Sequence, residues 1–395
     1  MTEPASLYRS PNALAPHYSR FRVSERLLLT GHSHQAWPDC GFEAQSAAWL
    51  DAARYVDDKW DHAFDRAERV REGFSRLIGD PGDGLALAPN THELVVRLLS
   101  ALPLRARPRL VTTDGEFHTI RRQLDRLAEE GLEVVRVAQQ PLETVSQRLA
   151  AAVDDRTALA LVSAVFFDTG RITRGLGEVA ASCRRHGAAL LVDVYHALNV
   201  VPFSLAEQGL GDAFVVGGGY KYCQLGEGNC FLRLPPGTDQ RPVVTGWYSE
   251  FTALAERQER GRVVYGRGGD RFAGATYDPT SHYRAAAVFD FFREEGLTPE
   301  LLREVSQHQI GVLTAAFDAL DLDPGVVARD RAVPLGEIGG FLALRAPGAA
   351  SLARELHARG VMVDTRGDVF RFGPAPYLSD AQLRDAIGTL GEVVR

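Results

Sequence analysis

The sequence predicts an α/β protein with a mostly parallel sheet between helices, followed by a smaller α+β domain. Between Leu85 and Leu234, short apolar runs alternate with amphipathic stretches of helical length. The run Ala188–Val192 is continuously apolar, as expected of a strand buried on both faces. Near Arg241-Pro242 this alternation ends, and a long helical pattern over Ser281–Glu295 opens a region of different character.

Each element follows from a local pattern. The first helical stretch is Phe42–Ile78, where apolar residues recur among charged ones until a Pro-Gly-Asp-Gly turn stops the helix. Strands are then predicted at Leu85–Ala88, Arg109–Thr112, Val134–Val137, Ala158–Val165, Ala188–Val192, from Val215, and at Cys230–Leu234. The intervening helices are predicted at Thr91–Leu102, Thr119–Glu130, Leu142–Ala152 and Leu176–His186. Such βα repetition requires crossover connections and therefore a parallel sheet.

The chain divides into three predicted parts. Residues 1–40 are rich in Pro, Ser and His and indicate an N-terminal arm crossing the surface. Residues 41–245 form the large domain, and residues 246–395 form the small one, with strands at Gly340–Leu344 and Val369–Phe372. The arm is expected to pack with the small domain.

Composition narrows the class of function. The 395 residues carry a net charge of −7, which gives no electrostatic reason to expect nucleic acid or an anionic membrane as a partner. No run approaches a membrane span, and the N-terminus shows no signal peptide, so a cytoplasmic protein is expected. The four cysteines form no CxxC pair, and no metal site is predicted.

Lys221 and Asp193 are the residues whose placement points to chemistry. Asp193 ends the apolar run Ala188–Val192, and open α/β sheets bind ligands beyond the carboxyl ends of their strands. Lys221 lies 28 positions later, directly after the glycines of Gly217–Gly219. A buried lysine can become a nucleophile for carbonyl groups, and a buried carboxylate needs a partner such as a protonated ring nitrogen. Together they suggest pyridoxal phosphate (PLP), with Lys221 as the Schiff-base lysine.

Plainer interpretations exist for both residues. Asp193 could be a helix cap or a metal ligand, and Lys221 could be a solvated loop residue. Phosphate-binding motifs do not account for the glycines, because Gly218–Tyr222 lacks the P-loop pattern and Gly217–Tyr222 lacks the third glycine of a dinucleotide fingerprint.

Further candidates lie where other predicted strands end. Asn90 and Thr91 begin a helix, where free N–H groups attract a phosphate, although either residue could simply cap the helix. Phe117 could stack on a flat cofactor ring or pack in the core. His196 could contact the cofactor's phenolic oxygen or be a structural histidine. Arg371, among apolar neighbours, could hold a substrate carboxylate bidentately or form a structural ion pair.

Several motifs in order resemble one known family. The chain resembles PLP-dependent fold type I enzymes of the class V aminotransferase group, and kynureninase most nearly. The motifs are Asp193–Ala197 (DVYHA), Gly219–Tyr222 (GYKY), Gly226–Gly228 (GEG), Thr245–Tyr248 (TGWY) and Arg371–Tyr377 (RFGPAPY). Cysteine desulfurases carry a catalytic cysteine late in the chain, whereas no cysteine follows Cys230 here.

The resemblance implies a role for each matched residue. Lys221 would bind PLP covalently and carry the α-proton, and Asp193 would keep the ring nitrogen protonated. Phe117 would stack on the ring, with His118 as the alternative if the local alignment shifts by one. Thr91, Tyr220 and Trp247 would bind the phosphate of PLP. Thr276 would bind the phosphate in the partner subunit, which implies a homodimer. Arg371 would bind the α-carboxylate of the substrate.

The substrate half of the site departs from the kynureninase pattern. Gly31–Gln35 reads GHSHQ where kynureninases usually show Gly-Asn-Ser-Leu-Gly, and Phe166-Phe167 stands where they show an Asn-Tyr pair. After the stacking aromatic, the expected aspartate is absent. His32, Ser33, His34 and Phe167 are therefore the positions where a different substrate could be specified.

The predicted function is a PLP-dependent reaction on an α-amino acid. The first interpretation is kynureninase-like hydrolysis of a Cβ–Cγ bond with release of alanine. The alternative is a class V aminotransferase or a C–S β-lyase, because PLP supplies most of the chemistry in each case. A non-catalytic protein with the same fold is the third interpretation, and the intact Lys221 and Asp193 argue against it.

Overall fold

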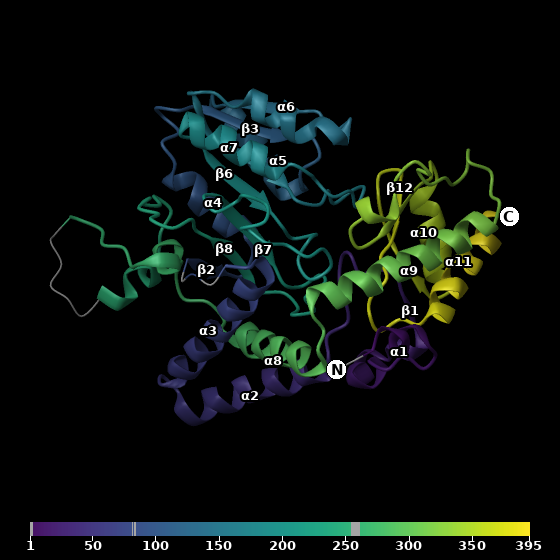
Figure 1. Ribbon diagram of the computed structural model, residues 1–395. Helices are drawn as coiled ribbons and strands as arrows, with labels where there is room; N and C mark the ends of the chain where they lie inside the picture. Colours follow the sequence, from purple (N-terminus) through teal and green to yellow (C-terminus); the bar gives the residue numbers. More distant parts are fainter. Residues whose placement is uncertain (1–2, 81, 83, 254–260) are drawn as a thin grey trace.

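A computed structural model describes residues 3–80, 82, 84–253 and 261–395 of the chain (Figure 1). Its centre is a seven-stranded sheet in the order β2-β8-β7-β6-β5-β3-β4. The strands from β7 to β4 are all parallel, and β8 runs antiparallel to both of its neighbours. Their bounds are β2 Leu85–Ala88, β3 Arg109–Thr113, β4 Glu133–Val137, β5 Thr157–Ser163, β6 Ala189–Asp193, β7 Phe214–Gly218 and β8 Cys230–Arg233. The predicted mostly parallel sheet is confirmed.

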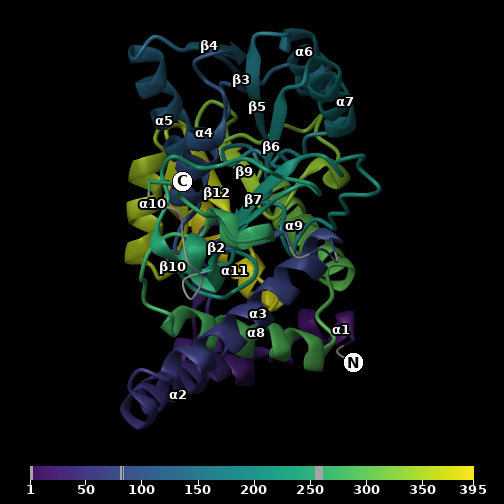
Figure 2. The same ribbon diagram turned by 90° about the vertical axis from the view of Figure 1, so that its left-hand side faces the viewer.

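Helices cover both faces of this sheet. They are α4 (Thr91–Ala101), α5 (His118–Glu129), α6 (Val145–Ala152, preceded by η3 Leu142–Thr144) and α7 (Leu176–His186). Figure 2 shows α4 and α5 on one side of the strands and α6 and α7 on the other. Within β6, Leu190 and Val192 join one hydrophobic core while Leu191 joins the other. Burial on both faces is why the strand reads as a continuous apolar run.

The single helix predicted over Phe42–Ile78 is in fact two helices. They are α2 (Asp39–Tyr55) and α3 (Lys59–Ile78), separated at Val56, which has a φ of 53°. A β-branched residue rarely adopts a positive φ, so the sequence carries little signal for this break. Both helices pack against α8 (Thr280–Glu295), and the three lie together below the sheet in Figure 1.

The C-terminal part is built around a three-stranded antiparallel sheet in the order β11-β12-β9. The strands are β9 Leu342–Arg345, β11 Asp364–Arg366 and β12 Val369–Phe372, and the helices are α9 Pro299–Ala319, α10 Ala349–Ala358 and α11 Asp380–Val394. Helix α9 is absent from the sequence-based predictions, although Thr298 caps it by accepting a hydrogen bond from the Leu301 N–H. The predicted smaller α+β unit is present.

Residues 3–40 pack on this C-terminal part. They contain α1 (Pro4–Tyr8), η1 (Ala15–Phe21), η2 (Val23–Glu25) and β1 (Leu27–Leu28), and β1 pairs in parallel with β10 (Val361–Met362). The Gly31 N–H donates to the Gly373 carbonyl at 2.8 Å, which brings His32 beside β12. A side chain at Gly373 would clash with His32, since an added Cβ would lie 2.2 Å from the His32 Nδ1. The division at residues 40 and 245 stays a prediction.

Three short 3-10 helices complete the fold: η4 (Trp247–Ala253), η5 (Gly268–Phe272) and η6 (Leu335–Glu337). Among the described residues, no helix combines the length and the apolar character that crossing a membrane requires.

Candidate active site

The carboxyl ends of the parallel strands meet at one edge of the large sheet. Asp193 ends β6, opposite Ser163 on β5 and Val216 on β7. Phe117 follows β3, Phe167 follows β5, and Lys221 follows β7. Residues from four separate segments therefore converge where open α/β sheets bind their ligands.

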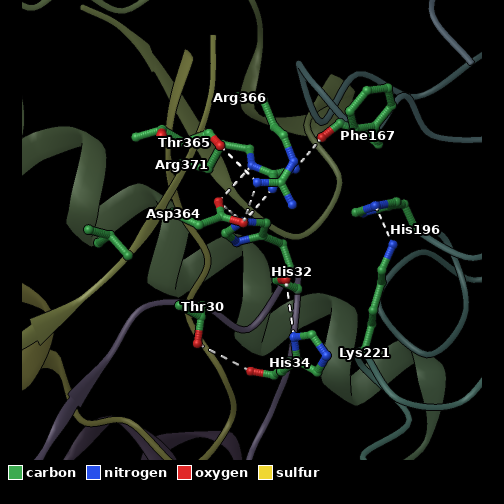
Figure 3. A network of polar contacts seen from close by, with 12 residues as sticks. Thr30, His32, His34, Phe167, His196, Lys221, Asp364, Thr365, Arg366 and Arg371 are labelled. Atoms are coloured by element: carbon green, nitrogen blue, oxygen red, sulfur yellow. Dashed lines mark hydrogen bonds and ion pairs between the residues drawn. The ribbon is translucent and has the colours of Figure 1, made fainter. Parts of the chain in front are cut away.

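The Lys221 side chain is buried at this edge. Its Nζ atom lies 2.6 Å from Nε2 of His196 (Figure 3). Burial lowers the pKa of Lys221 to about 7; the negative charge of Asp193 opposes this shift, and the guanidinium of Arg371 adds to it. Burial and the charge of Lys221 also hold the pKa of His196 well below its ordinary value. A large fraction of Lys221 is therefore a neutral amine at neutral pH, as a nucleophilic lysine requires.

Asp193 presents a carboxylate with spare hydrogen-bonding capacity. Its Oδ1 accepts a hydrogen bond from the Tyr195 N–H at 2.8 Å. Burial raises the pKa of Asp193, while the Tyr195 N–H and the charge of Lys221 act in the opposite direction. In the part of the chain that the structure describes, its second oxygen accepts no hydrogen bond. A protonated ring nitrogen would satisfy that oxygen and relieve the cost of burying the charge.

Aromatic side chains surround the amine. The Nζ atom of Lys221 lies 5.5 Å from the ring centroid of Phe117 and 4.7 Å from that of Tyr195. Phe167 meets Phe117 edge to face, with ring centroids 5.3 Å apart, and lies at the same distance from His118. The structure thus places Phe117 beside Lys221 and His118 farther along the same aromatic cluster.

The loop that carries Phe117 is anchored by a buried carboxyl group. Glu116 accepts hydrogen bonds from the hydroxyls of Thr113 and Ser163, both at 2.6 Å, and from the Ser163 N–H at 3.2 Å. Burial raises the pKa of Glu116 to about 7, although these hydroxyls oppose the shift. Because Ser163 is the neighbour of Asp193 across the sheet, Glu116 ties the Phe117 loop to the strand pair that holds Asp193.

Arg371 is engaged by a residue of its own sheet. It donates from Nε to Oδ1 of Asp364 at 2.8 Å, from Nη2 to Oδ2 of Asp364, and from Nη1 to the Phe167 carbonyl at 2.6 Å. The buried His32 lies 2.7 Å from Oδ1 of Asp364 through Nε2. Burial lowers the pKa of His32 to about 4, so its ring is neutral near pH 7. Burial alone would raise the pKa of Asp364, but bonds to His32 and Arg371 outweigh it and lower that pKa.

The remaining predicted substrate residues lie nearer the surface. His34 stacks on Tyr220, with ring centroids 4.8 Å apart, and its Nε2 lies 3.4 Å from a carboxylate oxygen of Glu227. The Ser33 Oγ lies 3.2 Å from Nδ1 of His34. His34 is exposed and Ser33 is half-buried, so they border the site, whereas His32 is buried beside Asp364 (Figure 3).

The predicted phosphate residues form two groups. Asn90 caps α4, since its side chain accepts a hydrogen bond from the Glu93 N–H at 2.9 Å, and Thr91 is the first residue of that helix. Trp247 and Thr276 contact each other, with the indole Nε1–H donating to the Thr276 hydroxyl at 3.1 Å. A role for either group in phosphate binding stays a prediction.

Asp364, Arg366 and Glu116 are functional candidates that the sequence-based predictions do not include. A signal for Asp364 exists, because Gly367-Asp368 is a two-residue turn with a Gly φ of 57°. That turn sets the register of β11 and β12 and places Asp364 directly opposite Arg371. Glu116 has no comparable local signal, because its partners come from β3 and from the distant strand β5.

Taken together, the residues present suit PLP. They supply a neutral amine at Lys221, an unsatisfied carboxylate oxygen at Asp193 and an aromatic face at Phe117. His196 adds a buried Nδ1 atom without a partner among the described residues. The described residues contain no group of three or more His, Cys, Asp or Glu side chains that could hold a metal ion.

Comparisons with known proteins agree with this geometry. Residues 331–390 match the family model of the kynureninase C-terminal domain. The chain is 28% identical over 336 residues to a kynureninase of Xanthomonas oryzae pv. oryzae, covering 78% of this chain and 75% of that protein. It is 24% identical over 343 residues to the uncharacterized aminotransferase YcbU of Bacillus subtilis (strain 168), covering 86% and 87%.

Solved structures share the whole fold at low sequence identity. A variant of C-DES, with glycine linked covalently to its PLP cofactor, superposes with a TM-score of 0.82 at 16% identity, over 95% of this chain and 98% of that chain. A cysteine desulfurase from Thermococcus onnurineus gives a TM-score of 0.78 at 17% identity, over 94% and 95%. The predicted fold type I architecture and the resemblance to the class V group of PLP-dependent enzymes are confirmed.

Proposed function

We propose that this chain, which has the fold of the class V PLP-dependent enzymes, binds PLP and acts on an α-amino acid. The observation that carries the proposal is the placement of the buried Lys221 and of Asp193 at the carboxyl edge of the sheet, where burial lowers the pKa of the Lys221 amine to about 7. Known relatives support it, since the proteins of similar sequence include kynureninases and an aminotransferase. A non-catalytic role is disfavoured because both residues are in place.

PLP, when bound, would act as an electron sink for a carbanion at the substrate's α-carbon. The residues of this chain would hold the cofactor in place and transfer the protons. Asp193 would hold a proton on the ring nitrogen, and Phe117 would stack on the ring and fix its plane. Lys221, with a pKa near neutrality, can accept a proton from the α-carbon and return one. His196, held neutral at 2.6 Å, would orient the Lys221 amine.

The first proposed reaction is kynureninase-like hydrolysis of a Cβ–Cγ bond, in which alanine is released. Support comes from the kynureninase C-terminal match and from the relatives of 28% identity. Transamination is the alternative, supported by the aminotransferase relative, and C–S β-elimination is a second alternative, supported by the shared fold of the C–S lyase C-DES. The side chain of the substrate, and with it the reaction, would be selected by His32, Ser33, His34 and Phe167.

A homodimer with shared active sites is also part of the proposal. Thr91, Tyr220 and Trp247 would bind the phosphate within one subunit, with Asn90 capping the same helix, and Thr276 would reach the phosphate of the partner subunit. We expect a cytoplasmic enzyme that acts on a small-molecule amino-acid substrate and has neither nucleic acid nor a membrane as a partner.

The experiment is to add L-kynurenine to the purified, PLP-loaded protein and to follow anthranilate fluorescence. Rapid release of anthranilate with alanine as co-product would support the hydrolase, and a Lys221→Ala protein should release none. A change in the absorbance of bound PLP without anthranilate would exclude the hydrolase and favour an aminotransferase or a C–S lyase.

A further inference from the structure

We propose that Arg97 is a positioning residue that holds Thr276 in place, so that the Arg97 of one subunit strengthens phosphate binding in the active site of its partner. The step rests on the proposed function, in which Thr276 reaches the PLP phosphate of the partner subunit. It adds a residue in the middle of helix α4 that no sequence motif singles out.

Helix α4 holds the guanidinium of Arg97 from one side. Its Nη2 donates to Oε2 of Glu93 at 2.7 Å, one helical turn earlier. Glu93 is itself held, because its Oε1 accepts a hydrogen bond from the Asn90 amide at 3.2 Å and its N–H donates to the Asn90 side chain at 2.9 Å. Arg97 is buried, and a buried charge that loses its partner is costly. The guanidinium is therefore fixed relative to the start of α4.

The other side of this guanidinium holds the segment that leads to Thr276. Nη1 of Arg97 donates to the carbonyl of Phe272, the last residue of η5, at 3.2 Å. Gly274 lies against the same group, since a Cβ added there would be 2.2 Å from Nη2 of Arg97. A glycine lets the backbone approach the guanidinium this closely. The chain is thus anchored on Arg97 two residues before it reaches Thr276.

Thr276 is placed for a contact outside its own chain. It is exposed, as is Ala275 before it, whereas Lys221 is buried. Thr276 borders a cavity of about 580 Å³ that Glu93 and Arg97 also line. An exposed hydroxyl can donate to a phosphate that a second subunit brings, and the backbone held by Arg97 sets where that hydroxyl lies. The positioning residue and the phosphate that it serves would then belong to different subunits.

PLP and pyridoxal, which lacks the phosphate, separate this role from general damage to the protein. Absorbance titration of PLP-free protein measures both affinities for the natural chain, Arg97→Gln, Arg97→Lys and Arg271→Gln. Arg271 is the matched control, because this arginine of η5 donates to the carbonyls of Asp239 and Gln240 rather than to α4. Arg97→Gln should bind PLP on the order of tenfold more weakly, the effect of one hydrogen bond to a charged group, and should bind pyridoxal unchanged. Arg97→Lys should lie between, and Arg271→Gln should match the natural chain.

Mixed dimers, purified through two different tags, show in which subunit Arg97 acts. The absorbance of PLP linked to Lys221 reports only the site that keeps this lysine. When Arg97→Gln is paired with Lys221→Ala, that site receives Thr276 from a subunit with an intact Arg97, so it should bind PLP as tightly as the natural protein. When the natural chain is paired with the double variant Arg97→Gln/Lys221→Ala, the site should bind on the order of tenfold more weakly.

The reverse pattern in the two mixed dimers would overturn the proposed role of Arg97. Equal losses of affinity for PLP and pyridoxal in Arg97→Gln would also overturn it, and so would a natural protein that binds PLP as a monomer. Each of these outcomes leaves PLP binding by this chain standing. Failure of the natural protein to bind PLP would instead refute the proposed function, and the role of Arg97 with it.

Discussion

The Nζ atom of Lys221 lies 2.6 Å from Nε2 of His196, and both side chains are buried. Two nitrogens this close share a single proton, because two N–H groups pointing at each other would repel. Since the pKa of His196 is far below its ordinary value, its imidazole is neutral and the pair carries at most one positive charge. The pKa of Lys221 itself is lowered to about 7, chiefly by burial.

The rate of PLP incorporation should therefore depend on pH in a specific way. Only the neutral amine attacks the PLP aldehyde, so the rate should rise as the pH increases through about 7 and level off above it. Stopped-flow absorbance of PLP-free protein mixed with PLP measures this profile. A rate that rises only near pH 10, the range of an ordinary lysine, would contradict the burial effect on Lys221.

Replacing Asp193 should separate folding from chemistry. Asp193→Ala should retain the fold and lose nearly all activity, because no carboxylate then keeps the ring nitrogen protonated. Circular dichroism checks the fold. Anthranilate release from L-kynurenine checks activity, or, if the natural protein releases none, turnover of whichever amino acid it converts. Unchanged turnover would rule out the role given to Asp193.

Removing Asp364 should destabilise the small domain. Asp364→Ala leaves the guanidinium of Arg371 buried with the Phe167 carbonyl as its remaining acceptor, and breaking a buried ion pair costs about 3 kcal/mol of unfolding free energy. Urea unfolding measures the loss. Asp368→Ala, in the exposed turn of the same hairpin, is the matched control and should be nearly neutral. Equal effects in both variants would mean that the Asp364–Arg371 pair contributes nothing specific.

Glu116 should give the protein a pH-dependent stability. Its pKa in the folded protein is about 7, above the ordinary value of 4.5, so the folded state binds more protons between these values. The stability that Glu116 contributes is therefore present below about pH 4.5 and is lost as the pH rises through 7. Glu116→Gln should remove this loss, which amounts to about 3 kcal/mol for a shift of this size. Urea unfolding at pH 5 and pH 8 tests it, and identical pH dependence in both proteins would contradict it.

The sheet was predictable because each strand carries its own signal. β5, β6 and β7 each contain a short apolar run, and the segment between β5 and β6 has the length and pattern of the helix α7. The break at Val56 was not predictable, since it depends on how α2 and α3 both pack on α8 rather than on a residue that favours a positive φ. Local hydrophobic patterns therefore predict where strands and helices lie, but they do not predict a break within a helical stretch such as the one at Val56.

The site was predictable to the extent that it lies at strand ends. Lys221, Asp193 and Phe117 follow three strands whose order in a parallel sheet brings their ends together. Asp364 and His32 reach the site through long-range pairing, β11 with β12 and the N-terminal arm with β12. Such contacts depend on register and on packing between segments far apart in the sequence, so a structural ion pair of Arg371 was one predicted alternative but its partner Asp364 was not predicted.

The central claim is that PLP becomes attached to Lys221, and the chain allows an unusually clean measurement of it. Its sequence contains only two lysines, Lys59 and Lys221. Reduction of the PLP-loaded protein with borohydride, followed by mass mapping of peptides, locates the pyridoxyl group. We predict a label on Lys221 in the natural chain and in Lys59→Arg, and none in Lys221→Ala. A label confined to Lys59, or none on either lysine, would contradict the account.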